Sequence, residues 1–212
     1  MGLIATDGCL SSDGRHLDLT SKDKEQIQTF MRCLDIEHLK IGMKNKECSN
    51  WAYRVQWGDV VLYNFLLGIG LMPKKSMVLG KIAMPDKYFL DFLRGSFDGD
   101  GSFYSYFDPR WKSSFMYYLA FTSASPDHIE WLQTMLKRLL HVKGHISKTI
   151  RDERKWHSLY SLRFAKREAL IVMNAMYSTS CRAHLSRKRL KIEAALRIVG
   201  ESLAVPKKGR RK

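Results

Sequence analysis

Two stretches of this chain correspond to each other along almost their whole length. Residues 2–8, GLIATDG, align with residues 95–101, GSFDGDG. A segment rich in β-forming residues follows each copy, and the two segments end in Thr20-Ser21 and Thr122-Ser123. Features that recur in one order along a chain indicate a duplicated structural unit. The chain is therefore predicted to fold as two related halves.

The same elements are predicted after each Thr-Ser pair. Apolar residues recur at helical spacing, Ile27 with Phe30 in the first half and Ile129 with Leu132 in the second, which predicts an amphipathic helix in each. Two short strands and another helix follow, so the order in both halves is helix, hairpin, helix, hairpin, helix. The predicted strands are residues 39–44, 51–57, 144–150 and 158–164, and the closing helices are residues 60–67 and 169–177.

A junction between the halves is expected at residues 84–86, Met-Pro-Asp, because proline ends most regular elements. This gives a first repeat over residues 1–85 and a second over residues 86–200, both of mixed α+β class. Residues 201–212 end in PKKGRRK and are interpreted as a basic C-terminal tail. The tail would either gain phosphate contacts or be solvated without a specific role.

The charge of the chain is positive and unevenly distributed. Lys and Arg number 36 against 21 Asp and Glu, a formal net charge of +15. Up to Phe92 there are 12 basic and 11 acidic residues, which leaves 24 and 10, or +14, for the remainder. Such an excess indicates a polyanionic partner, and nucleic acid is the first expectation.

Several classes of protein are disfavoured. No run of about 18 apolar residues predicts a membrane span, and the N-terminus has no basic region typical of a secretion signal. Four cysteines without a CxxC spacing argue against a zinc knuckle or a disulfide framework. These observations predict an intracellular protein, in a bacterial or archaeal cytoplasm or in an organelle.

Small residues four apart recur in the two Asp-Gly motifs. Gly2 lies one helical turn from Thr6, and Gly95 lies one turn from Gly99. Small side chains at this spacing let two helix backbones approach closely. The two motifs are therefore predicted to be helices that pack against each other.

An acidic residue is predicted to end each motif helix. Gly8 and Gly101 suit the left-handed position that follows a helix, which places Asp7 and Asp100 at the two C-termini. A carboxylate there opposes the helix dipole by about 0.3–1 kcal/mol, and a divalent cation would compensate for this cost. Two carboxylates with exposed backbone carbonyls beside them form an oxygen-rich site suited to Mg²⁺.

The predicted metal ligands are the carboxylates of Asp7 and Asp100 and the carbonyls of Thr6 and Gly99. A single Asp-Gly is more often a turn, but its duplication in a basic chain favours a site. Asp98 supplies another acid in the second motif. The repeat aligns it with an alanine, so it is expected to be a hydrogen-bonding residue at the helix end.

The two motifs, above all residues 92–103, FLRGSFDGDGSF, resemble the paired signature motifs of single-chain, two-repeat LAGLIDADG homing endonucleases. The resemblance implies two αββαββα repeats, related by a pseudo-dyad through the motif helices, whose antiparallel sheets bind DNA in the major groove. It also implies a monomer that cleaves both strands of a long, asymmetric duplex site and leaves short 3′ overhangs. Asp7 and Asp100 correspond to the acids that bind Mg²⁺, with Ca²⁺ as a non-cleaving substitute. The first motif departs from the family because only one residue precedes its glycine.

The resemblance also suggests residues around the acids. Gln56 and Arg163 occupy equivalent strand positions, opposite in direction to their apolar neighbours, where residues line the family's solvent pocket. Lys75 and Lys188 match the family's pocket lysines, with Lys74 as the alternative because the alignment can shift by one. These groups would position water and neutralise phosphate charge. The alternatives are a structural polar network for the first pair and ordinary phosphate contacts or solvated charge for the lysines.

Residues that read bases are expected on the outward face of the strands, where polar side chains alternate with apolar ones. The predicted tip at residues 108–112, DPRWK, mixes aromatic and basic residues, as suits a loop at the edge of a groove. Strand residues of this kind are also commonly only solvated, or contact phosphate alone. The candidates are His16, Asp18, Lys40, Lys44, Lys46, Arg54, Arg110, Lys112, Tyr118, His145, Ser147, Thr149, Arg151 and Ser161.

Three functions follow from these interpretations. The favoured one is a site-specific, Mg²⁺-dependent DNA endonuclease that mobilises its own intron or intein reading frame. The alternatives are a maturase that binds intron RNA and a non-catalytic DNA-binding protein on the same scaffold. The presence of both motif acids favours cleavage.

Overall fold

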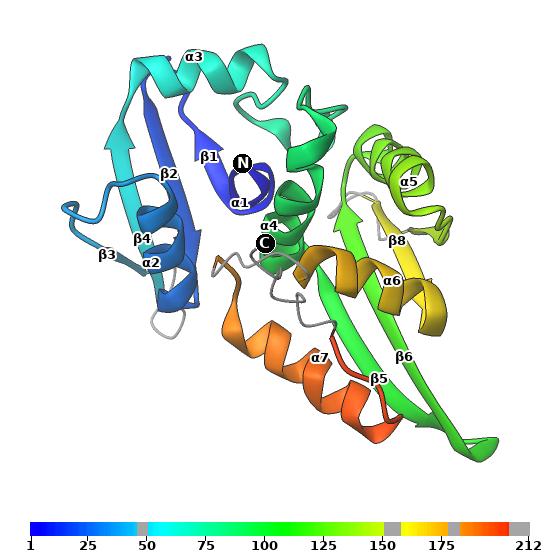
Figure 1. Cartoon of the computed structure of the whole chain (residues 1–212). Coiled ribbons are helices and arrows are strands. Elements are labelled where there is room, and N and C mark those ends of the chain that lie inside the picture. Colours follow the sequence, from blue (N-terminus) through cyan, green and yellow to red (C-terminus); the bar gives the residue numbers. More distant parts are fainter. Residues whose placement is uncertain (46–50, 151–157, 178–182, 204–212) are drawn as a thin grey trace, which may run out of the picture.

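Two antiparallel sheets flank a central pair of helices, α1 (Gly2–Thr6) and α4 (Phe89–Asp100), in the computed structural model of the chain (Figure 1). The structure describes residues 1–45, 51–150, 158–177 and 183–203. Each sheet has four strands, in the order β1-β2-β4-β3 and β5-β6-β8-β7. This arrangement confirms the α+β class and the twofold organisation predicted from the repeat.

Both halves contain the predicted order of elements. In the first half these are β1 (Gly8–Leu10), β2 (His16–Ser21), α2 (Lys24–Cys33), β3 (Gly42–Asn45), β4 (Trp51–Gly58) and α3 (Val60–Gly68). In the second half they are β5 (Ser102–Asp108), β6 (Trp111–Ser123), α5 (Pro126–Leu140), β7 (His145–Thr149), β8 (Leu159–Ala165) and α6 (Lys166–Tyr177).

The strand register repeats as well. Leu19 pairs with Val55 between β2 and β4, and Phe121 pairs with Leu162 at the matching place between β6 and β8. All four of these side chains are buried. The register therefore confirms the alignment of the two repeats residue by residue.

Three helical elements were not expected from the sequence. These are α7 (Ser186–Ile198) and two 3-10 turns, η1 (Lys75–Met77) and η2 (Asp86–Tyr88). The apolar residues of α7 do not share one face, since Leu190 and Ile198 are exposed while Ile192 and Leu196 are buried, so its helical period is weak in the sequence. Residues 201–203, predicted as the start of the basic tail, are packed instead, because the Tyr117 hydroxyl donates to the Glu201 carboxylate at 3.1 Å and Leu203 is buried. The rest of the predicted tail, residues 204–212, lies outside the described residues.

One face of each sheet is covered by helices and the other is open. On the covered side of the first sheet, Phe30 of α2 packs on Trp57 of β4 with ring centroids 5.5 Å apart. On the covered side of the second sheet, α5 and α6 both contact β6 and β8. Alternating burial along the strands follows from this arrangement, because successive side chains point to opposite faces.

The motif helices pack at backbone distance, as predicted. A β-carbon at Gly2 would lie 2.1 Å from the Phe92 carbonyl oxygen, and one at Gly95 would lie 3.1 Å from Gly2 Cα. Only glycine fits at such a contact, so the two glycines bring the helix ends together. Within the described residues, no helix is long and apolar enough to span a membrane.

Candidate active site

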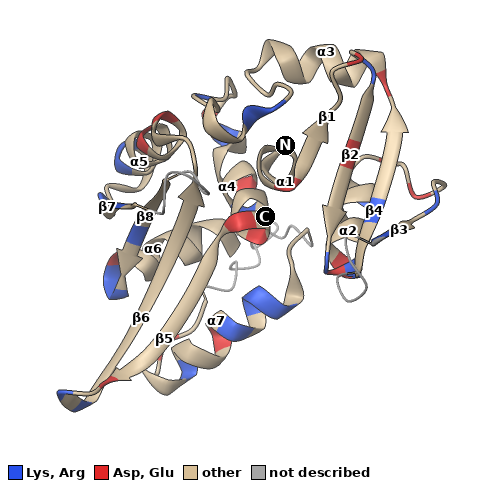
Figure 2. Cartoon of the chain, turned by 180° about the vertical axis from the view of Figure 1, so that it is seen from behind, with Lys and Arg blue, Asp and Glu red and all other residues tan. Residues whose placement is uncertain are grey.

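Asp7 and Asp100 lie at the ends of α1 and α4, where the two repeats meet. Asp7 is the C-cap of α1, and its backbone N–H donates to the Leu3 carbonyl at 2.9 Å. A β-carbon on Gly99 of α4 would lie 3.1 Å from Asp7 Oδ2, so this carboxylate rests on the helix of the other repeat. Figure 2 shows acidic residues at the ends of both motif helices, in the centre of the molecule.

The left-handed conformation predicted for Gly8 and Gly101 is wrong. Gly101 has φ −70° and ψ 152°, and neither glycine has a positive φ. Each residue leads directly into a strand, which requires extended backbone. Glycine is needed for space instead, because a β-carbon would lie 2.6 Å from Ile4 Cα at Gly8 and 2.4 Å from the Phe97 ring at Gly101.

The charge of Asp100 affects the ionisation of Asp7. Burial and, to a smaller extent, the charge of Asp100 raise the pKa of Asp7 to about 6, against the lowering effects of Gln26, Lys188 and Lys75. Burial also raises the pKa of Asp100, while the same two lysines lower it. The acids are therefore close enough to repel each other when both are ionised. A bound cation would offset this repulsion.

Two buried lysines are close enough to this pair to lower the pKa of both acids. The Lys188 ammonium donates to the carbonyls of Phe97, Gly99 and Gly101 at 2.5, 2.9 and 2.7 Å. These contacts satisfy carbonyls at the end of α4, where no helical N–H follows. An ammonium has three donors, so in this geometry Lys188 acts through its charge rather than by contact with water or phosphate.

Lys75 occupies the corresponding position in the first repeat. It is buried and donates to the Gly8 carbonyl, whereas Lys74 is exposed. Burial lowers the pKa of Lys75, and the charges of Asp100 and Asp7 act in the opposite direction. The structure therefore favours Lys75 over Lys74 in the alignment with Lys188.

Asp98 has the structural position expected of it. It is buried, and its Oδ2 accepts a hydrogen bond from the Leu185 N–H at 3.0 Å. This contact anchors the segment that leads into α7 to the end of α4. Burial raises the pKa of Asp98 to about 7, with the Leu185 bond and the charges of Lys188 and Arg94 acting against it.

Gln26 of α2 is a site residue that the sequence analysis missed. It is 4% exposed, and its Nε2 donates to Asp7 Oδ2 at 2.8 Å. The sequence contains one signal, because Gln26 directly precedes the buried Ile27 and so lies beside the apolar face of the helix. That signal does not distinguish a site residue from an ordinary buried amide.

One of the two predicted carbonyl ligands already accepts a hydrogen bond within the protein. The Gly99 carbonyl accepts from Lys188 at 2.9 Å, and a metal contact by the Thr6 carbonyl stays a prediction. No group of three or more His, Cys, Asp or Glu among the described residues could hold a metal alone. Two carboxylates still fit Mg²⁺, which is commonly bound by one or two carboxylates together with substrate phosphates.

The candidate base-reading residues of the first sheet lie on its open face. Asp18 pairs with Gln56 across β2 and β4, and the carboxylate of Asp18 accepts from Arg54 at 2.9 Å. A cavity of about 280 Å³ on this face is lined by Lys40, Lys44, Arg54 and Gln56. His16 is on the same face and contacts the Asp13 carboxylate at 2.6 Å, and Lys46 lies outside the described residues.

The open face of the second sheet is aromatic, which the sequence analysis recognised only at Tyr118. Tyr118 stacks on Tyr104, with centroids 5.0 Å apart, and on Tyr106 at 6.1 Å. Arg163 lies 5.4 Å from the Tyr118 ring and donates to the Tyr104 hydroxyl at 3.3 Å. Alternation along β5 would have identified Tyr104 and Tyr106.

The other candidates of the second repeat surround this aromatic cluster. His145 pairs with Arg163, and Ser147 pairs with Ser161, so these four side chains share one face. Thr149 is at the end of β7. Arg110 and Lys112 are exposed at the β5–β6 tip, which Figure 2 shows as basic. Arg151 lies outside the described residues.

Gln56 and Arg163 take equivalent places on the two open faces, as the alignment predicted. Both are exposed between buried neighbours. The contacts of Arg163 are with tyrosines, and the cavity beside Gln56 does not include the motif acids. A role for either residue at the scissile phosphate stays a prediction.

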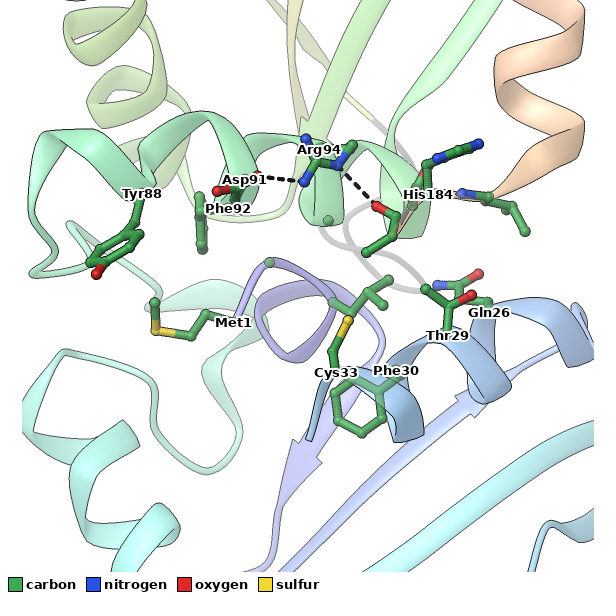
Figure 3. A pocket seen from close by; sticks show the side chains of 16 residues that line it. Met1, Gln26, Thr29, Phe30, Cys33, Tyr88, Asp91, Phe92, Arg94 and His184 are labelled. Atoms are coloured by element: carbon green, nitrogen blue, oxygen red, sulfur yellow. Dashed lines mark hydrogen bonds and ion pairs between the residues drawn. The ribbon is translucent and has the colours of Figure 1, made fainter. Parts of the chain in front are cut away.

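Three cavities surround the acids and Gln26. One of about 400 Å³ borders Asp7 and includes Lys44 and Arg187, and one of about 30 Å³ borders Asp100. A third, of about 280 Å³, lies between Met1, Phe30 and Phe92 and reaches Gln26 from behind (Figure 3). Of the two cavities that border a motif acid, the one at Asp7 also has Lys and Arg side chains in its wall.

Residues 88–176 match a family profile described as LAGLIDADG-like domain. The homing endonuclease I-WcaI bound to its DNA recognition sequence is 15% identical, with a TM-score of 0.59 over 90% of this chain and 82% of that one. I-DmoI in complex with DNA and Mn is 16% identical, with a TM-score of 0.50 over 85% of this chain and 94% of that one.

Full-length DUF199/WhiA from Thermatoga maritima is 15% identical, with a TM-score of 0.57 over 99% of this chain. The chain spans 61% of the length of that protein. No curated protein sequence matches the chain. The profile match lies in the second repeat, and the first repeat has the same elements in the same register. The chain thus contains a LAGLIDADG-like domain and has the fold of the LAGLIDADG homing endonucleases.

Proposed function

We propose that this protein is a site-specific endonuclease that hydrolyses both strands of a DNA duplex. The observation that carries the proposal is the pairing of Asp7 and Asp100 at two helix ends, with the buried Lys75 and Lys188 beside them. Two open sheet faces with basic and aromatic side chains support a DNA partner. The likeness in fold to nucleases bound to DNA agrees with this reading.

Each residue has a defined part in the proposed reaction. Asp7 and Asp100 would hold divalent metal at the scissile phosphates, and the metal would supply Lewis-acid activation of water. The water loses a proton to solvent as its oxygen forms a bond to phosphorus, and the bond from phosphorus to the 3′-oxygen breaks. The released 3′-oxygen then takes up a proton from solvent. Lys75 and Lys188 would stabilise the added negative charge through their own charge.

The finer features of the proposal follow the family resemblance. Mg²⁺ is the proposed ion, the chain acts as a monomer, and the target is long and asymmetric because the two open faces differ in side chains. Cleavage leaves short 3′ overhangs and mobilises an intron. The protein would work where its target DNA is, in a bacterial or archaeal cytoplasm or in an organelle.

A second candidate is a nucleic-acid-binding protein that does not cleave. One observation favours it, because the Gly99 carbonyl, a predicted metal ligand, accepts a hydrogen bond from Lys188. Intron RNA is a further partner that the same open faces would fit.

Cleavage of a plasmid library in Mg²⁺ separates these candidates, with Asp7→Asn and Asp100→Asn compared with the wild type. Each substitution is expected to abolish double-strand cleavage and to leave DNA affinity within a few-fold. Wild-type cutting by both variants would overturn the assignment of the acids. Binding without any cutting by the wild type would establish the second candidate.

A further inference from the structure

A chain of hydrogen bonds fixes the Asp7 carboxylate from the first repeat. The Asp23 N–H donates to Ser21 Oγ at 3.1 Å, and this hydroxyl donates to Gln26 Oε1 at 3.0 Å. Gln26 Nε2 then donates to Asp7 Oδ2 at 2.8 Å. Because the hydroxyl occupies the carbonyl end of the amide, the NH₂ end must face the carboxylate.

The second repeat retains the first link of this chain and lacks the last. The Ser125 N–H donates to Ser123 Oγ at 3.1 Å, which matches the contact in the first repeat. Ile27 corresponds to Ile129 at the same spacing from each serine, so His128 occupies the position of Gln26.

His128 does not hold the second acid. Its Nδ1 is 3.0 Å from the Gly80 carbonyl oxygen, and its ring packs on Phe92 and Trp131. Within the described part of the chain, no side chain donates a hydrogen bond to the Asp100 carboxylate. The two acids therefore differ in how far the protein orients them.

The cavities beside the two acids also differ in size. The cavity at Asp7 is about 400 Å³ and contains Gln26 in its wall, whereas the one at Asp100 is about 30 Å³ and contains His128. Gln26 also borders the apolar cavity behind it (Figure 3). A gap on that side means that hydrogen bonds, more than packing, fix the direction of the amide.

We propose that Gln26 is a positioning residue for Asp7, and that His128 in its place makes the two halves of the active site unequal. This inference rests on the proposed nuclease function. A carboxylate held in one direction is pre-organised to bind a cation, because less orientational freedom is lost on binding. The first repeat therefore binds metal more tightly, and the strand that depends on Asp7 is cut first.

The test compares Gln26→Met, which keeps the length of the side chain but removes its hydrogen bonds, with Gln28→Met. Gln28 is exposed on the same helix and serves as the matched control. The probes are Mn²⁺ alone, titrated by electron paramagnetic resonance, and a duplex target labelled on each strand in turn. Thermal unfolding of both variants verifies that they are folded.

Gln26→Met is expected to weaken Mn²⁺ binding at least threefold and to slow one strand at least tenfold, with the other strand within threefold. The slowed strand should be the one that Asp7→Asn affects more. The rate for this strand should also begin to fall at a higher pH on the acid side. The reason is that the Gln26 amide no longer favours the ionised form of the Asp7 carboxylate. Gln28→Met should match the wild type in all three measurements.

Equal slowing of both strands, or unchanged Mn²⁺ affinity with an unchanged pH profile, would overturn the inference. A wild-type protein that cuts no target would overturn the nuclease proposal instead. The Mn²⁺ titration requires no cleavage, so it still decides whether Gln26 positions Asp7.

Discussion

Gly99 of the second repeat leaves room for Asp7 of the first. A β-carbon at Gly99 would lie 3.1 Å from Asp7 Oδ2, 2.7 Å from Thr6 Cβ and 2.0 Å from Thr6 Oγ1. Gly99→Ala is therefore expected to destabilise the protein by about 1–3 kcal/mol, as overpacking does, and to lower cleavage by displacing the carboxylate.

Urea unfolding and single-turnover cleavage measure these two effects. Gly68→Ala is the matched control, because Gly68 ends α3 and a β-carbon there meets no atom within 4 Å. It should leave stability unchanged or raise it by up to about 1 kcal/mol. A Gly99→Ala protein with wild-type stability and rate would contradict the close packing of the two motifs.

Cleavage is expected to depend on pH through Asp7. Burial and the charge of Asp100 raise its pKa to about 6, so the carboxylate is largely protonated at pH 5 and ionised at pH 7. Only the ionised form binds a cation, so the single-turnover rate at limiting Mg²⁺ should rise about tenfold per pH unit below pH 6 and level off above it. A rate that stays flat down to pH 5 would show that Asp7 does not titrate in this range.

Asp98→Asn is expected to stabilise the protein at neutral pH. Burial raises the folded-state pKa of Asp98 to about 7, above its unfolded value, so the folded state binds more protons between about pH 4 and 7. The free energy of unfolding of the wild type therefore decreases as pH rises through this window. An asparagine does not ionise, so the variant shows no such decrease, and its side-chain oxygen still accepts from the Leu185 N–H.

We expect the free energy of unfolding of Asp98→Asn to exceed that of the wild type by about 1–3 kcal/mol at pH 8 and to equal it at pH 3.5. Urea unfolding across this pH range measures the difference. Glu130→Gln, at an exposed position on α5, is the control. A gain of the same size at both pH values would show that ionisation of Asp98 is not its cause.

Lys188→Met is expected to lower both the free energy of unfolding and the rate of cleavage. It removes the donor to the carbonyls of Phe97, Gly99 and Gly101, and buried acceptors without partners cost about 2–4 kcal/mol in total here. Lys191→Met, at an exposed position on the same helix, should change the free energy of unfolding by less than about 0.5 kcal/mol. Equal stability of the two variants would mean that Lys188 does not cap α4.

Arg163→Ala is expected to lower DNA affinity about tenfold or more, by roughly 1–3 kcal/mol, because the aromatic cluster holds this guanidinium on the open face. If Arg163 contacts phosphate, the slope of log affinity against log salt concentration should also fall by about one. Fluorescence anisotropy with a labelled duplex at several salt concentrations measures both. Arg167→Ala, at an exposed position on α6, should behave as the wild type.

The sequence alone determined the duplication, the contact between the motif helices and the outward face of each strand. These features depend on local periodicity and on residue size. Gly2 and Gly95 are small because backbones meet there, and Leu17 and Leu19 alternate with polar residues because β2 has one covered face. The spacing of small and apolar residues within each helix or strand reflects these constraints, so they can be read from the sequence.

Only the tertiary structure decided what surrounds the acids. Gln26 is 19 residues from Asp7, and Lys188 is 89 residues from Gly99, so neither contact has a local signature. The glycine after each motif was misassigned because a strand begins there at once, which makes space rather than a positive φ the requirement. Long-range packing brings these groups together, and the pKa of a buried carboxylate depends on all of them at once.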